Sequence, residues 1–137
     1  METSPLINAC KKNAESLLLE FSEFYPFALG LTATEEIVSV NAQMPDDDEF
    51  PTSENVISEL QKALELSNRG NHFTEVCICL DVKVNIPKSQ NATDALEIRL
   101  NFRDYNPLNY YSPYTVNNNI VSFGPDFYED GEEFLTF

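Results

Sequence analysis

The sequence predicts an α+β fold with the order α-β-β-α-β-β-β-β, in which a mainly antiparallel sheet carries two helices packed on one face. Two segments with apolar residues at three- and four-residue spacing predict the helices, and segments that alternate apolar and polar residues predict the strands. No strand–helix–strand unit repeats, which disfavours a doubly wound parallel sheet. The 137 residues are typical of one domain, here 1–137, that can bury a core without disulfides or metal.

The segment from Glu75 to Arg103 is the most strongly patterned part of the chain. Its first half places Val76, Ile78, Leu80, Val82, Val84 and Ile86 at every second position. After the polar break Pro87–Asn91 the alternation resumes at Leu96, Ile98, Leu100 and Phe102. Such runs predict an antiparallel hairpin with one buried face. We therefore expect a shared core position, facing a helix, for Leu80, Val82, Ile98 and Leu100.

A hairpin pivot at Ser89–Gln90 sets Lys83 opposite Glu97 and Asp81 opposite Arg99. Opposite charges facing each other across strands are favourable, so these residues predict a ladder of ion pairs. The same converging charges are also an alternative polar ligand site, with Asp81 and Arg99 as its anchors. Cys77 and Cys79 fall on the face opposite the valines, either beneath a helix or at the surface.

The segments before this hairpin predict a helix, a hairpin and a second helix. Ser4 and Pro5 are typical of a helix start, and Pro26 sets its latest end. The ranges 24–31 and 37–40 predict two strands. A second helix is expected over 55–67, capped by Thr52 or Ser53, with a stop at residues 68–71.

The segment beyond Arg103 holds two further predicted strands and a tail. The strands are expected over 109–116 and 120–123, separated by the turn 117–119. Residues 126–133 form an acidic tail. We expect the end of the chain to dock on the domain through Phe134, Leu135 and Phe137.

Five segments of the sequence, in this order, resemble a family of small acidic bacterial α+β proteins without a known activity. They cover about half the chain and are FYPFA at 24–28, VCICLDVKV at 76–84, TDALEIRL at 93–100, Pro113-Tyr114 and Phe123-Gly124. The resemblance implies a cellular context and a fold, and it implies no chemistry.

The net charge of −15 and a sequence pI near 4.1 restrict the partners. Such a surface repels nucleic acid and anionic lipid, and it suits a basic protein partner or serves solubility alone. No secretory leader or apolar run near 18 residues stands out, and three cysteines do not make a disulfide framework. We therefore expect a cytoplasmic protein that binds neither nucleic acid nor membrane.

The residues that usually carry chemistry are sparse. His72 is the only histidine, and Cys77 and Cys79 lack the i, i+3 spacing of a zinc or redox motif. The run 46–49 lacks the alternating spacing of a calcium loop, and the four glycines form no phosphate loop. We expect no catalytic residue, no cofactor and no tightly bound transition metal.

The acids concentrate in two segments that we predict to bind a basic partner, with aromatic anchors nearby. The candidate residues are Asp46, Asp47, Asp48, Glu49 and Phe50, followed by Asp126, Phe127, Tyr128, Glu129 and Asp130.

Three functions are compatible with this sequence. The first is a non-catalytic protein-interaction module, in particular an immunity-type protein that neutralises a basic toxin domain. The second is a small-molecule binder or enzyme with a pocket walled by the aromatic C-terminal segment and anchored by Asp81 and Arg99. The third is a structural homo-oligomer that pairs through an exposed sheet edge.

Overall fold

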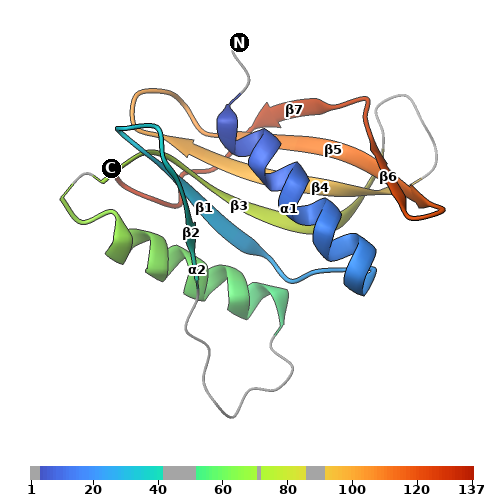
Figure 1. The fold of residues 1–137 in the computed structure, drawn as a ribbon. Helices are drawn as coiled ribbons and strands as arrows, with labels where there is room; N and C mark the ends of the chain where they lie inside the picture. Colours follow the sequence, from blue (N-terminus) through green and yellow to red (C-terminus); the bar gives the residue numbers. More distant parts are fainter. Residues whose placement is uncertain (1–3, 42–51, 71, 86–91) are drawn as a thin grey trace.

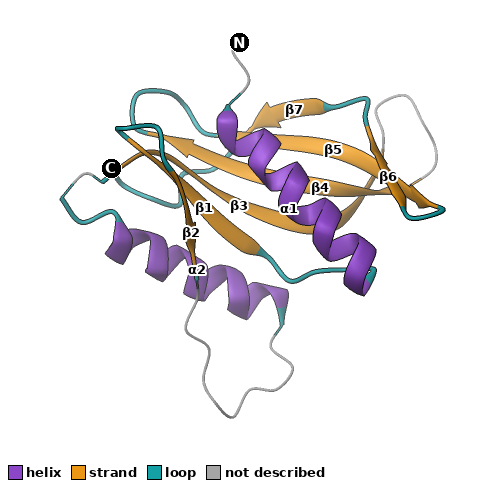
Figure 2. Ribbon diagram, viewed as in Figure 1, coloured by secondary structure: helices purple, strands orange, loops and turns teal. Residues whose placement is uncertain are grey.

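A computed structural model describes residues 4–41, 52–70, 72–85 and 92–137 (Figure 1). Within these ranges the chain forms two helices and a seven-stranded sheet, which confirms the α+β fold class (Figure 2). The predicted order of elements is also confirmed, with one additional strand at the end. The elements are α1 (Pro5–Phe21), β1 (Phe27–Thr32), β2 (Ile37–Val40), α2 (Ser53–Ser67), β3 (Phe73–Asn85), β4 (Ala92–Phe102), β5 (Leu108–Asn117), β6 (Ile120–Phe123) and β7 (Phe127–Asp130).

The strands follow the order β2-β1-β3-β4-β5-β6, and every pairing is antiparallel. β6 pairs with the second half of β5, and β7 pairs with its first half over Leu108–Tyr111. Asn118 and Asn119 adopt positive φ in the turn between β5 and β6, a conformation that asparagine tolerates. The predicted acidic tail therefore contributes a strand to the sheet.

The two helices cover opposite faces of the sheet, so the predicted placement on one face is wrong (Figure 1). α1 packs on the face that carries Leu29, Cys77 and Cys79, whereas α2 packs on the face that carries Val76 and Ile78. The reason is the composition of β3: residues 76–80 are all apolar and all buried. A strand buried on both sides needs a cover on both sides.

The register of the central hairpin also differs from the prediction. Asp81 lies opposite Leu96, and Lys83 lies opposite Asp94. The Lys83 Nζ atom is 4.0 Å from Oδ1 of Asp94. The predicted pairs of Asp81 with Arg99 and of Lys83 with Glu97 are therefore wrong. The shift is three residues, and an odd shift exchanges the faces of one strand relative to the other. Ile98 and Leu100 consequently lie beneath α1, whereas Leu80 and the partly buried Val82 belong to the α2 side.

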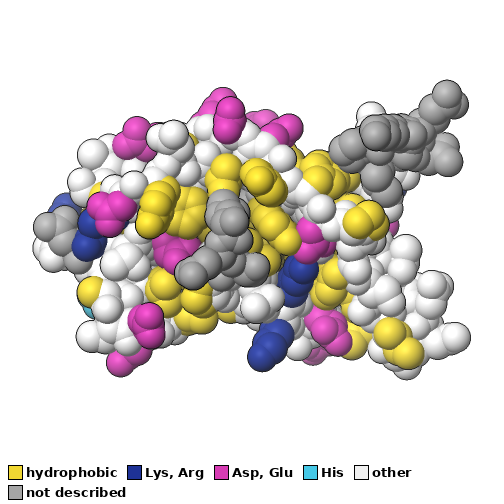
Figure 3. Space-filling view, turned by 90° about the horizontal axis from the view of Figure 1, so that it is seen from above, with side chains coloured by type: hydrophobic (Ala, Val, Ile, Leu, Met, Phe, Trp, Pro, Cys, Tyr) yellow, Lys and Arg dark blue, Asp and Glu magenta, His cyan; other side chains and the backbone are white. Residues whose placement is uncertain are grey.

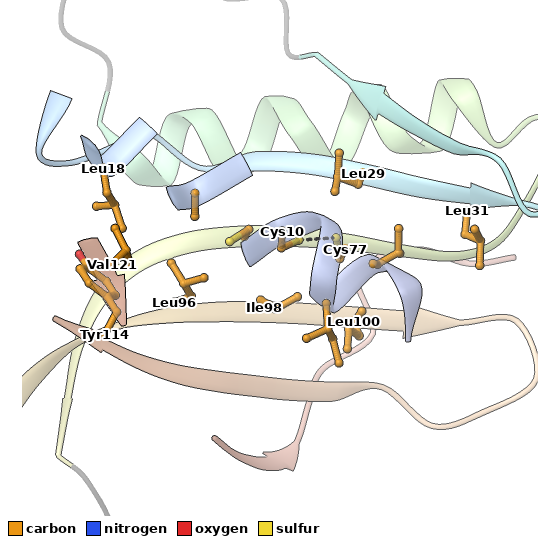
Figure 4. Close-up of a cluster of buried hydrophobic side chains, with 14 residues drawn as sticks. Cys10, Leu18, Leu29, Leu31, Cys77, Leu96, Ile98, Leu100, Tyr114 and Val121 are labelled. Carbon is orange, nitrogen blue, oxygen red and sulfur yellow. Dashed lines mark hydrogen bonds between the residues drawn. The ribbon is translucent and has the colours of Figure 1, made fainter. Parts of the chain in front are cut away.

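α1 begins as the sequence predicts and fills the first core. The Ser4 side chain caps the helix by accepting a hydrogen bond from the Leu6 amide at 3.1 Å, and Pro5 follows at the first helical position. The buried face of the helix then meets β1, β3, β4 and the β5–β6 hairpin (Figure 4). Cys10 and Cys77 lie together there, with sulfurs 3.4 Å apart, and Cys79 is also fully buried. The cysteines thus lie beneath a helix, one of the two predicted alternatives.

The second core lies under α2 and includes the end of the chain. Thr52 caps α2 by accepting a hydrogen bond from the Asn55 amide at 3.1 Å. The side-chain oxygen of buried Asn101 accepts hydrogen bonds from the amides of Phe134 and Leu135, at 2.8 and 3.2 Å. This contact seats Leu135 in the core beside α2, as the predicted docking of the C-terminal residues requires.

Truncation of Leu100 tests the α1 core directly. Its side chain is 1% exposed beneath α1. We expect Leu100→Ala to lower the free energy of unfolding by about 2–5 kcal/mol, because the lost apolar contacts leave a cavity. Denaturant unfolding measures the change. The matched control Ile120→Ala removes an exposed side chain and should cost less than about 0.5 kcal/mol. A cost below ~1 kcal/mol for Leu100→Ala would contradict the assignment.

Candidate functional site

An open groove of about 670 Å³ lies where the end of α1, the link to β1, the start of α2 and the middle of β3 meet. One part of its lining is apolar and comes from Leu17, Phe21, Phe24 and Tyr25. The other part is polar and comes from Glu23, Ser53 and Asp81. Aromatic walls with a few converging polar groups are typical of a ligand site. We call this feature the Asp81 groove.

The Asp81 carboxylate is held in place by the sheet. It accepts a hydrogen bond from the Tyr114 hydroxyl at 2.6 Å. Partial burial raises the pKa of Asp81, and the negative charges of Asp94 and Glu23 raise it further, against the lowering effect of its hydrogen bonds from Tyr114 and from the Phe24 backbone. Burial and the same hydrogen bond raise the pKa of the Tyr114 hydroxyl, which therefore stays a donor at neutral pH.

Asp126 occupies a different position, between α1 and β5. It accepts hydrogen bonds of 2.6 Å from Lys11 on α1 and from Tyr110 and Ser112 on β5. Burial alone would raise the pKa of Asp126, but these three partners outweigh it and lower the pKa. Asp126, predicted to contact a partner, thus joins α1 to β5 and the start of β7.

A second polar cluster lies on the sheet face that α2 covers, and its residues come from β4, β5 and β7. Arg99 donates to Glu97 at 2.8 Å, and the Tyr111 hydroxyl lies 2.9 Å from Glu97 and 3.0 Å from Glu129. Arg99 and Asp81 are on opposite faces of the sheet, because Arg99 pairs with Ile78 and Asp81 with Leu96. The structure does not bring the two predicted ligand anchors together.

The other predicted contact residues divide into two groups. Positions 46–50 lie outside the described residues. On β7, Phe127 stacks on Tyr111 with ring centroids 5.0 Å apart, whereas Tyr128 and Asp130 are exposed. Figure 3 shows acidic side chains at several separate places on the face in view, and not as one patch.

The aromatic C-terminal segment lines a smaller hollow of about 290 Å³, with Phe102, Tyr105 and Phe137 among its walls. Neither Asp81 nor Arg99 lines this hollow. In this hollow the C-terminal aromatic wall therefore meets neither of the two predicted anchors. Asp81 instead meets aromatic residues from the end of α1 and the link that follows it.

Within the described ranges, no three His, Cys, Asp or Glu side chains gather closely enough to hold a metal ion. In the same part of the chain, neither helix is long and apolar enough to cross a membrane. The sulfurs of the three cysteines are buried, and burial is the largest cause of the raised pKa of Cys77 and of Cys79. Such thiols are poor nucleophiles and poor metal ligands.

Of the described residues that line the groove, Asp81 alone belongs to the predicted site residues. Phe21, Glu23 and Tyr25 are exposed at the end of α1 and in the link to β1, where the sequence shows FSEFYPF. Three exposed or half-exposed aromatic residues flanking an acid before a proline are the pattern that marks it. The sequence predicts a strand at Tyr114, but the contact of Tyr114 with Asp81 depends on the register of three strands, β3, β4 and β5.

Comparisons with known proteins find no matching family model, no matching curated protein and no matching solved structure. The resemblance to a family of small acidic bacterial proteins therefore stays a prediction.

We expect Asp81→Asn to stabilise the protein at neutral pH. A carboxyl whose pKa is raised by folding costs stability while it is charged, and this cost disappears as the pH falls through its folded pKa. Asparagine removes the charge and keeps an oxygen that accepts from Tyr114. Because solvent screens this partly exposed site, the gain should be only about 0.2–1 kcal/mol.

Denaturant unfolding at several pH values measures this gain, which should be largest at neutral pH and shrink in acid. The control Asp130→Asn changes an exposed acid on β7 and should leave the stability within about 0.5 kcal/mol of wild type. A loss of more than 1 kcal/mol in Asp81→Asn would show that the charge supports the fold.

Asp126→Asn should have the opposite effect. Folding lowers the pKa of the Asp126 carboxyl, so its charged form stabilises the fold at pH values above the unfolded pKa. This contribution is lost as the pH falls through the folded pKa. Since the carboxylate accepts three hydrogen bonds, one of them from Lys11, we expect a loss of about 1–3 kcal/mol at pH 7. The difference from wild type should narrow in acid, and a loss that is equal at all pH values would contradict the assignment.

Proposed function

We propose that this chain is a non-catalytic cytoplasmic module that binds a basic protein. The supporting observation is an excess of acids that the protein's own bases do not neutralise. The chain has 23 Asp and Glu against 8 Lys and Arg, and described bases such as Lys11, Lys62 and Arg99 are already paired with acids of the same chain. A strongly negative domain attracts a basic partner at long range and speeds its encounter.

An immunity-type protein that neutralises a basic toxin domain, such as a nuclease, is the most specific form of this proposal. Such a protein needs a rigid acidic surface and no chemistry of its own. The two-sided core provides the rigidity, and the candidate contact residues on β7 belong to a paired strand. Tyr128 and Asp130 are exposed there as an aromatic anchor and a charge.

The first test identifies a partner and then measures its association rate. Proteins captured by the tagged chain from its source organism are identified by mass spectrometry, and each is purified and mixed with the chain in a stopped-flow instrument. We expect a partner with a strongly basic sequence pI, and an association rate that falls as salt shortens the Debye length, which is ~8 Å at physiological ionic strength. Partners that are neutral or acidic, or a rate independent of salt, would contradict the proposal.

A charge-matched pair of variants separates a local contact from net charge. One variant changes Asp46, Asp47, Asp48 and Glu49 to Asn or Gln. The control changes four exposed acids elsewhere, Glu15, Glu35, Glu36 and Glu65, to Gln. Both variants lose the same charge, so net-charge steering alone would slow association equally. We expect the first variant to slow it more and to raise the dissociation rate. Equal effects would show that the segment 46–49 is not a contact.

A further inference from the structure

The Asp81 groove has walls and charges that together define the chemistry of its occupant. Phe21 is 60% exposed and Tyr25 is 52% exposed, so two aromatic rings at one end of α1 remain in contact with water. Large aromatic side chains gain free energy when a partner covers them, and neighbouring exposed rings mark contact sites. The groove is therefore suited to an occupant with apolar surface.

The charged residues that line the groove, Glu23 and Asp81, are both acidic. The charged side chains that act on Asp81 are Glu23 and Asp94, and both are negative. Within the described residues, no ion pair joins a lysine or arginine to Asp81 or to Glu23, and the neighbouring Lys83 is paired with Asp94. The groove thus combines apolar walls with negative charge that lacks a counter-ion from the described chain, and it favours a cation with an apolar stem.

Two fixed contacts keep the acidic side ready for such a cation. The Tyr114 hydroxyl holds one oxygen of Asp81 at 2.6 Å, and the Phe24 backbone also bonds to the carboxylate. Phe24 is itself packed against Phe27, with ring centroids 5.5 Å apart. A carboxylate whose orientation is fixed before binding loses less entropy when a partner binds.

We propose that the Asp81 groove binds an arginine side chain of the basic protein partner, and this inference rests on the proposed function. The aliphatic stem lies against Leu17 and the aromatic walls, and the guanidinium reaches Asp81 and Glu23. Arginine fits better than lysine because its planar head stacks on aromatic rings and forms paired hydrogen bonds with a carboxylate. The complementarity of charge between an acidic chain and a basic partner selects this occupant.

The inference is tested first with a model compound. N-acetyl-arginine amide is titrated into the ¹⁵N-labelled protein and followed by NMR, with the lysine analogue and the uncharged citrulline analogue as comparisons. We expect chemical-shift changes at the amides of residues 21–25 and 81, largest for arginine, smaller for lysine and absent for citrulline. Equal shifts from citrulline, or shifts spread evenly over the acidic surface, would overturn the proposal.

Variants of the groove then test the same contact. Asp81→Asn should weaken binding of the arginine compound about tenfold, the value expected for the loss of one charge-assisted hydrogen bond. Phe21→Ala should weaken it several-fold, and this exposed side chain can be removed without disturbing the core. Glu65→Gln, at an exposed acid of α2, is the charge-matched control and should bind as wild type does. Equal affinities for Asp81→Asn and Glu65→Gln would overturn the proposal.

The final arm uses the captured partner and separates this inference from the proposed function. Both groove variants should raise the dissociation rate of the complex, and changing the bound arginine of the partner to alanine should make the groove variants indistinguishable from wild type. A basic partner that binds both variants as tightly as wild type overturns the groove while leaving the proposed function standing. An arginine compound that binds a chain with no basic protein partner overturns both, because the occupant is then a free cation.

Discussion

Burial of β3 on both faces is the constraint on which the rest of the structure depends. Residues 76–80 are all buried, so their side chains alternate between the core under α1 and the core under α2. A strand in this position requires one helix on each side, and it requires neighbours that are also apolar on both faces. β1 meets this condition, because five of its six residues are buried. One polar substitution within 76–80 would therefore leave an unpaired polar group inside a core.

The groove exists because β3 is longer than the elements that cover it. Its side chains are buried from Val76 to Leu80 and are at least partly exposed from Asp81 onward. α1 ends at Phe21 and the chain must then pass through residues 22–26 to enter β1, so the last turn of the helix and this link stand beside the uncovered part of β3. The position of Asp81 at this boundary explains how a carboxylate can be close to a core and still be reached from solvent.

The sequence predicted the elements well and their relative positions less well. Local chemistry sets the ends of the elements, as the Ser4-Pro5 start of α1 and the asparagine turn at 117–119 show. The sequence leaves open which sheet faces the helices cover, because Cys77 and Cys79 are compatible with a buried or an exposed face of β3. A run of five apolar residues is the pattern of a strand covered twice, and it predicts two-sided burial. The hairpin register depended on the link between β3 and β4, whose length no periodicity determines. The aromatic pattern at residues 21–25 marks one wall of the groove, but no local pattern brings Ser53 and Asp81 to it, because they are distant in the sequence.

Two partly buried carboxylates, Asp126 and Asp81, have opposite effects on stability. The charged form of Asp126 stabilises the fold, because three donors from α1 and β5 favour it and lower its pKa. The charged form of Asp81 costs stability, because burial and neighbouring acids disfavour it and raise its pKa. An acid that supports the fold needs no other role, whereas an acid that costs stability is typical of a site that functions through its charge. A bound cation would reverse that cost, because a positive charge beside Asp81 favours its charged form.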